Sequence, residues 1–139
     1  MKRSAKLLYW LPAIGLMSLI FYSSSRTSLV KSELSAVTGH FIGYAVLAIT
    51  YAFALSRTTK LNRKQLLFIP ILLAVLYGIS DELHQLYTPT RFSDINDVIV
   101  DFLGAAVGSY GYYLWNRLLI NRTPAEKCRR LVDKKERRT

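Results

Sequence analysis

The sequence has a single cysteine, Cys128, so a disulfide bond within the chain is excluded. It contains no Cys-x-x-Cys pair and no Cys/His spacing of the kind that forms a structural zinc site. The Gly-x-Ser-x-Gly elbow, the His-Glu-x-x-His helix and the Walker loop are also missing. Any chemistry would therefore depend on carboxylates, histidine or a bound metal ion.

Acidic residues are scarce, since 9 aspartates and glutamates stand against 19 lysines and arginines in 139 residues, giving a formal net charge of +10. A basic balance of this size suits either a nucleic acid or a membrane surface. The composition favours the membrane, because 51% of the residues are hydrophobic and the charges avoid the long apolar runs. No aromatic and basic patch supports a nucleic-acid partner.

Four apolar runs are candidate transmembrane helices, and they predict an all-α integral membrane bundle. They cover residues 7–25, 34–56, 66–80 and 102–116. The first run follows basic residues and can also be interpreted as a cleavable signal peptide, but the three further spans favour a retained helix. We predict one domain over residues 1–119 and a basic cytoplasmic tail over 120–139 that contacts anionic membrane lipids.

The distribution of lysine and arginine predicts the orientation, because positively charged flanks remain in the cytoplasm. Of the 19 basic residues, 16 lie before the first run, between the second and third, or after the fourth. Both termini are therefore predicted to be cytoplasmic in a multi-pass protein. The short connections at 26–33 and 81–97 would face the other side of the membrane.

Most of the acids are concentrated between the third and fourth runs. A helix rises about 1.5 Å per residue, so the fifteen residues of the third run cover only roughly 22 Å of a hydrocarbon layer about 30 Å thick. To cross, the third helix must continue through Asp81, Glu82 and His84, and the fourth must begin near Asp94. Ionisable groups at that depth are costly unless they pair or face a wet cavity, which makes them functional candidates.

Helical spacing places these polar residues on shared faces with small residues. The face of the third helix carries Gly78, Asp81, Glu82 and Gln85, whereas His84 lies on a different face. The stripe of the fourth helix consists of Asp94, Asp97, Asp101, Gly104, Gly108 and Gly111. The second helix adds His40 and Tyr44, four residues apart. Small-xxx-small patterns at 104–108 and 39–43 predict close helix approach, and the stripes together predict a polar pocket at the outer end of the bundle.

Arg91 is the one cation between the third and fourth runs, and it can pair with a carboxylate or bind a phosphate group of a ligand. The remaining negative charge can be relieved by protonation, by a bound divalent cation or by a cationic ligand, and the sequence leaves all three open. Structural alternatives also exist. Asp94 can be a helix N-cap, His40 can be an interhelical hydrogen-bonding residue, and His84 can be a residue of the membrane interface.

Three segments, "GHFIGYAVLA", "SDELHQLYTPTR" and "SDINDVIVDFLGAAVG", resemble the VanZ-like membrane proteins, a bacterial family named for teicoplanin resistance. The residues that match the family pattern are His40, Tyr44, Asp81, Glu82, Gln85, Arg91, Asp94, Asp97 and Gly104. Asp101 stands where the family often has asparagine, and Thr38 and Gly39 stand where a basic residue often precedes the histidine. The extra carboxylate could alter metal preference or the charge of the pocket.

The resemblance implies a protein of the bacterial cytoplasmic membrane that is linked to teicoplanin or lipoglycopeptide susceptibility. One hypothesis is a membrane enzyme that acts on a phospholipid or a lipid-linked cell-wall precursor. Its candidate catalytic residues are Asp81, Glu82, Asp97 and His40, and its candidate substrate-binding residues are Arg91, Gln85, Tyr44, Asp94, Asp101 and His84. The alternative is a non-catalytic protein that binds the antibiotic, a lipid or a partner at the outer leaflet. Transport is a weaker possibility, because four short spans enclose little of a path.

Overall fold

The computed structural model describes residues 6–25, 33–87 and 94–122, and all regular structure in these ranges is helical. A short 3-10 turn and four α-helices follow one another: η1 (Leu8–Trp10), α2 (Leu11–Ser24), α3 (Glu33–Thr58), α4 (Arg63–Gln85) and α5 (Ile95–Arg122). The prediction of an all-α chain is confirmed for the described residues. Most of the basic tail and the whole of the connection at 88–93 lie outside them.

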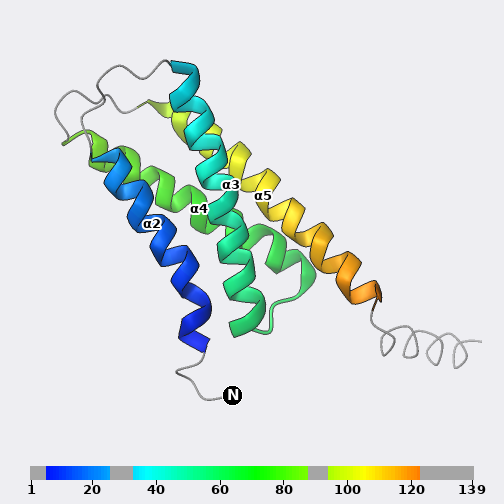
Figure 1. Ribbon diagram of the computed structural model, residues 1–139. Helices are drawn as coiled ribbons and strands as arrows, with labels where there is room; N and C mark the ends of the chain where they lie inside the picture. The colour runs from blue at the N-terminus through cyan, green and yellow to red at the C-terminus, as the bar shows by residue number, and fades with distance from the viewer. Residues whose placement is uncertain (1–5, 26–32, 88–93, 123–139) are drawn as a thin grey trace, which may run out of the picture.

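The four helices alternate in direction along the bundle (Figure 1). The end of α2, the start of α3, the end of α4 and the start of α5 gather at one end of the molecule. The connection from α3 to α4 lies at the opposite end, as does the start of α2. Residues from α3, α4 and α5 that are far apart in the sequence can therefore meet near the first of these ends.

The α4 helix begins at a capping box, in which each of two residues satisfies a free backbone amide of the other. The amide of Gln65 donates to the side-chain oxygen of Asn62 at 2.9 Å, and the amide of Asn62 donates to the side chain of Gln65 at 3.0 Å. The buried face of this helix changes character along its length, through Leu66, Pro70, Ala74, Gly78, Asp81, Glu82 and Gln85. One continuous face is therefore apolar at its start and polar in its last turns.

A hydrogen bond between α5 and α4 lies in the middle of the bundle. Pro70 lies inside α4, and proline has no backbone N–H to donate within a helix. Close to it, the buried Ser109 of α5 donates its hydroxyl to the carbonyl oxygen of Leu67 at 2.7 Å. Pro70 leaves the carbonyl of Leu66, four residues earlier, without its helical donor, so the bond from Ser109 to Leu67 is a separate polar contact between α5 and α4.

The helices α3 and α5 approach each other at the two predicted glycines of α5. A Cβ atom built on Gly104 would clash with the backbone of Phe41, and one on Gly108 would clash with the backbone of Ala45. Only a residue without a side chain permits this spacing. The prediction for Gly39 and Gly43 is wrong in this structure, because a Cβ on either glycine meets no atom within 4 Å.

The outer surface of the described helices is apolar enough to meet lipid. Leu72, Leu76 and Leu83, on one side of α4, are 57%, 54% and 56% exposed. Large exposed hydrophobics in a row are unfavourable in water and are expected against hydrocarbon. Two described helical segments, Ala36–Thr58 and Arg63–Gln85, have the length and composition to cross a membrane. A crossing by all four helices and the cytoplasmic position of the termini stay predictions.

We expect Gly108→Ala to destabilise the bundle, because the new methyl group would meet the Ala45 backbone, which cannot move without separating α3 from α5. Overpacking of this kind typically costs about 1–3 kcal/mol. Thermal unfolding of the detergent-purified protein measures the effect. Gly111→Ala is the matched control on the same helix, since nothing lies within 4 Å of its Cβ position. Equal stability of the two variants would show that the close approach does not matter.

Candidate functional site

An ionisable pair joins α3 to α5 near the end of the bundle where the connections at 26–32 and 88–93 begin and end. The Nδ1 atom of His40 lies 3.0 Å from Oδ1 of Asp101, and the two side chains are 15% and 1% exposed. An ionised carboxylate only accepts hydrogen bonds, so Nδ1 carries the proton in that state. The other ring nitrogen, Nε2, is then left for a further partner.

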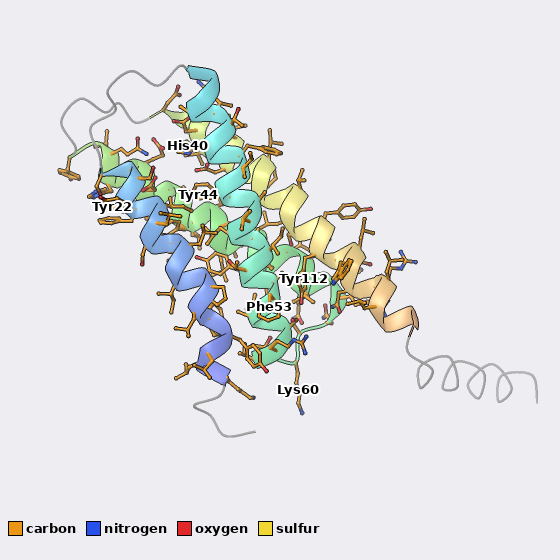
Figure 2. The ribbon with its side chains drawn as sticks, viewed as in Figure 1. Tyr22, His40, Tyr44, Phe53, Lys60 and Tyr112 are labelled. Atoms are coloured by element: carbon orange, nitrogen blue, oxygen red, sulfur yellow. The ribbon has the colours of Figure 1, made fainter. Side chains whose placement is uncertain are left out.

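Tyr44 and Gly78 form the inner boundary of this pair. The ring of Tyr44 lies one helical turn from His40 and is parallel to it, with 6.1 Å between the ring centres and 4° between the planes (Figure 2). A Cβ atom on Gly78 would come within 2.7 Å of Oδ2 of Asp101 and 3.2 Å of the Tyr44 ring. The absence of a side chain at residue 78 thus makes room for the Asp101 carboxylate.

Gln85 ties together the two acids of α4. Its side-chain amide donates to Oδ2 of Asp81 and to Oε1 of Glu82, each at 3.2 Å, and all three residues are buried. The helical spacing of three and four residues brings the amide under both carboxylates. The last turns of α4 therefore hold two carboxylates in fixed positions.

The other oxygen of Glu82 reaches the start of α5. The backbone amide of Asp94 donates to Oε2 of Glu82 at 3.0 Å. The side chain of Asp94 accepts from the backbone amide and the side-chain amide of Asn96, both at 2.9 Å. This is the pattern of an N-cap, in which a short polar side chain satisfies a free amide of the first turn. The side chain of Asp94 is exposed and serves the helix end.

One histidine and two carboxylates meet between the three helices. One ligand atom from each of His40, Glu82 and Asp97 lies within 4.8 Å of the other two, an arrangement that could hold a metal ion. We call these three residues the triad. It combines an imidazole nitrogen with carboxylate oxygens, a donor set that can hold a divalent ion or exchange protons with a ligand.

Several buried polar atoms beside the triad have no hydrogen-bond partner among the described residues. They are the hydroxyl of Tyr44, Oδ1 of Asp81 and Oδ2 of Asp101, and a further such atom, Oγ of Ser24, occurs at the end of α2. Asp81 is 3% exposed and Tyr44 only 1%. Because buried polar groups are normally paired, atoms of this kind call for a bound ion, water, proton or ligand.

A comparison with protein-family models finds a match to VanZ/LLP1 over residues 9–116. The chain belongs to the VanZ/LLP1 family. No curated protein and no solved structure matched it. Membership and the two candidate spans together indicate a membrane protein. The matched range contains His40, Tyr44, Asp81, Glu82, Gln85, Asp97 and Asp101, which we call the polar cluster. The polar cluster therefore lies within the family domain and not in the tail.

One of the predicted binding residues of this VanZ/LLP1 protein, His84, lies apart from the triad. His84 lies with Nε2 at 3.1 Å from the hydroxyl of Ser25, and its ring centre is 4.5 Å from that of Phe21. It therefore contacts α2 and its C-terminal end, away from the triad. Arg91, the predicted phosphate ligand, lies outside the described residues.

The direct pair of His40 and Asp101 is the part of the site that sequence reasoning missed. Both residues were singled out, but they are 61 positions apart, and no helical period relates residues of different helices. The available signal was that each is an ionisable residue next to a glycine-rich interface, Asp101 three residues before Gly104 and His40 beside Phe41. Two such residues on helices that touch are expected to meet.

We expect Asp94→Asn to leave stability nearly unchanged and Asp94→Ala to lower it, since asparagine caps a helix about as well as aspartate and loss of the cap costs about 1 kcal/mol. Thermal unfolding of both variants measures the difference. A stability loss in Asp94→Asn as large as in Asp94→Ala would mean that the charge of Asp94, and not its capping geometry, is needed.

Proposed function

We propose that this VanZ/LLP1 protein acts on a phosphate-bearing lipid of the cell envelope, either a phospholipid or a lipid-linked cell-wall precursor, and thereby affects teicoplanin susceptibility. The observation that carries the proposal is the pair of His40 and Asp101 beside Glu82 and Asp97. A histidine whose Nδ1 is held by a carboxylate is oriented to exchange a proton through Nε2.

The position of the cluster suits a lipid headgroup. His40 lies near the start of the candidate span Ala36–Thr58, and Glu82 lies near the end of the candidate span Arg63–Gln85. At about 1.5 Å of rise per residue, each is only roughly 5–6 Å from the end of its span. That depth corresponds to the boundary between hydrocarbon and headgroups, where the phosphate of a lipid lies.

The residues have distinct roles in the proposed reaction. His40 transfers a proton to or from the attacking or leaving group, and Asp101 fixes the ring and stabilises its protonated form. Glu82 and Asp97 lie across from the ring, and their positions are set by Gln85 and by the first turn of α5. Asp81 is linked to the same cluster through Gln85.

A second candidate function is binding without turnover. It is favoured by the hydrogen bonds on both oxygens of Glu82, which make this acid well suited to a fixed, electrostatic role. In this case the cluster would recognise a cationic group of an antibiotic, a lipid or a partner at the outer leaflet. Single charge neutralisations would then weaken binding gradually and would not abolish a reaction.

The experiment starts from a deletion strain complemented with the wild-type chain, with His40→Gln or with Glu82→Gln, at matched membrane levels. We expect only the wild type to restore teicoplanin tolerance. Ser80→Ala is the control, because Ser80 is exposed on α4, directly before Asp81, and its hydroxyl donates to the carbonyl of Tyr77 in the same helix. Full restoration by both acid–base variants would remove these residues from the function.

Purified protein separates the two candidate functions. Incubation with phospholipid or lipid-linked precursor should give product that increases with time, and His40→Gln should slow it by about 10²-fold or more, the usual contribution of general acid–base catalysis. Saturable lipid binding without any product, however long the incubation, would instead support the binding function.

A further inference from the structure

We propose that the triad of His40, Glu82 and Asp97 binds one divalent transition-metal ion, and that Asp101 positions His40 for it. The inference rests on the proposed function and revises one role within it: the lone pair of Nε2 of His40 binds a metal ion and not a proton, because it cannot hold both. Metal binding can be measured without any substrate. The failure of one proposal can therefore be told apart from the failure of the other.

The spacing of the triad is the first support. Nitrogen and oxygen ligands bind Zn²⁺ at about 2.0–2.2 Å, so two ligands of one ion are at most roughly 4.4 Å apart. Ligand atoms of the three residues already lie within 4.8 Å of one another. This separation exceeds the coordination limit by only a few tenths of an ångström, so the three side chains would have to move closer together to hold an ion.

The orientation of His40 is the second support. Its Nδ1 is held by Asp101, so Nε2 is the nitrogen that remains for a metal. Metal-binding histidines almost always donate their other N–H to a carboxylate, carbonyl or water, which fixes the ring and makes the ligand more basic. Asp101 is a buried carboxylate that provides this interaction from a neighbouring helix.

Charge compensation is the third and independent support. Asp101 is fully buried, yet its Oδ2 has no hydrogen-bond partner among the described residues, and Oδ1 of Asp81 is in the same state. A buried carboxylate is very unfavourable unless positive charge lies near it. A divalent ion on Nε2 polarises the imidazole and draws positive charge towards Asp101 through Nδ1–H.

The neighbouring groups fix the position of Glu82 without preventing coordination. Its oxygens accept from the Gln85 side chain and from the Asp94 amide. An ionised carboxylate has about four lone-pair sites on its two oxygens, so hydrogen bonds and an ion can share the same group. Such partners are typical of the shell around a metal site, where they orient the ligands.

The donor set indicates the class of ion. One imidazole nitrogen and two carboxylate oxygens suit Zn²⁺ or Mn²⁺, whereas Ca²⁺ and Mg²⁺ prefer oxygen alone and thiolate sites select softer metals. Three protein ligands leave an open coordination position, as in catalytic zinc sites. A phosphate oxygen of a lipid could occupy that position.

The test uses the full chain, purified in detergent with a tag free of histidine, stripped with a chelator and then dialysed against Zn²⁺ or Mn²⁺. Elemental analysis should find about one ion per chain, and titration should show saturable binding that Ca²⁺ and Mg²⁺ do not match. His40→Gln and Asp97→Asn should each lower the affinity by at least about 10-fold, the lower end of the effect seen even for outer-shell partners.

The controls distinguish this site from adventitious binding. His84→Gln removes the other histidine, Asp94→Asn removes a nearby acid outside the triad, and Cys128→Ser removes the thiol; all three should retain wild-type affinity. Asp101→Asn should weaken binding about 10- to 100-fold and change the visible absorption spectrum of bound Co²⁺. Its thermal stability without metal is measured alongside, since a purely structural role would change that and not the spectrum of the bound ion.

Two results would overturn the proposal. One is the absence of stoichiometric, saturable metal in a monodisperse wild-type protein. The other is unchanged affinity in both His40→Gln and Asp97→Asn, provided that size-exclusion profiles match the wild type. Stoichiometric metal without lipid turnover would contradict the proposed reaction and leave the metal site standing.

Discussion

The close approach of α3 and α5 is the contact on which the rest of the structure depends. Gly104 and Gly108 lie against the backbone of Phe41 and Ala45, and this fixes the register between the two helices. His40 precedes Phe41, and Asp101 lies one turn before Gly104. The backbone contact therefore sets the distance between the imidazole and the carboxylate, and a shift of one turn along either helix would separate them.

A second constraint is that the buried acids of α4 lie on a helix face that also packs apolar residues. The same face of α4 packs Leu66 and Ala74 in its first half and Asp81 and Gln85 in its last turns. Helix packing buries this whole face, so the acids are buried together with the apolar residues. Their polar atoms must find partners inside the bundle, because lipid offers none. The amide of Gln85 and the first turn of α5 supply several of these partners.

Much of the fold could be predicted from periodicity and length. The third apolar run was too short to cross, which required α4 to continue through Glu82, and the structure has it end at Gln85. The glycine pair at Gly104 and Gly108 was also predicted correctly, because a four-residue spacing of small residues has one main use in such helices. The same four-residue spacing at Gly39 and Gly43 predicted a close approach that the structure does not have at these glycines. Small residues permit close contact but do not ensure it, and in the described part of the chain no atom lies within 4 Å of the Cβ position of Gly39 or Gly43.

The site was less predictable than the fold, for a physical reason. Spacing along one helix identifies which residues share a face, and this sufficed for Asp81 and Gln85. It cannot specify which residues on different helices meet, since that depends on packing distances between backbones. The pairing of His40 with Asp101 depends on such three-dimensional detail, whereas the cap formed by Asp94 is a local contact with Asn96 that the sequence offered as an alternative. The count of charges predicted that the negative charge of the acids must be relieved. It could not show where in the bundle this happens.

The overlap of fold and site limits what a loss of activity can mean in this protein. Glu82 links Gln85 of α4 to the amide of Asp94 at the start of α5, so it contributes to stability as well as to the triad. His40 joins α3 to α5 in the same way. Substitutions that preserve shape, such as Glu82→Gln, keep much of the packing and remove mainly the charge. A bundle that stays folded after such a change, yet loses metal, would separate the charge of the cluster from its role in holding the helices together.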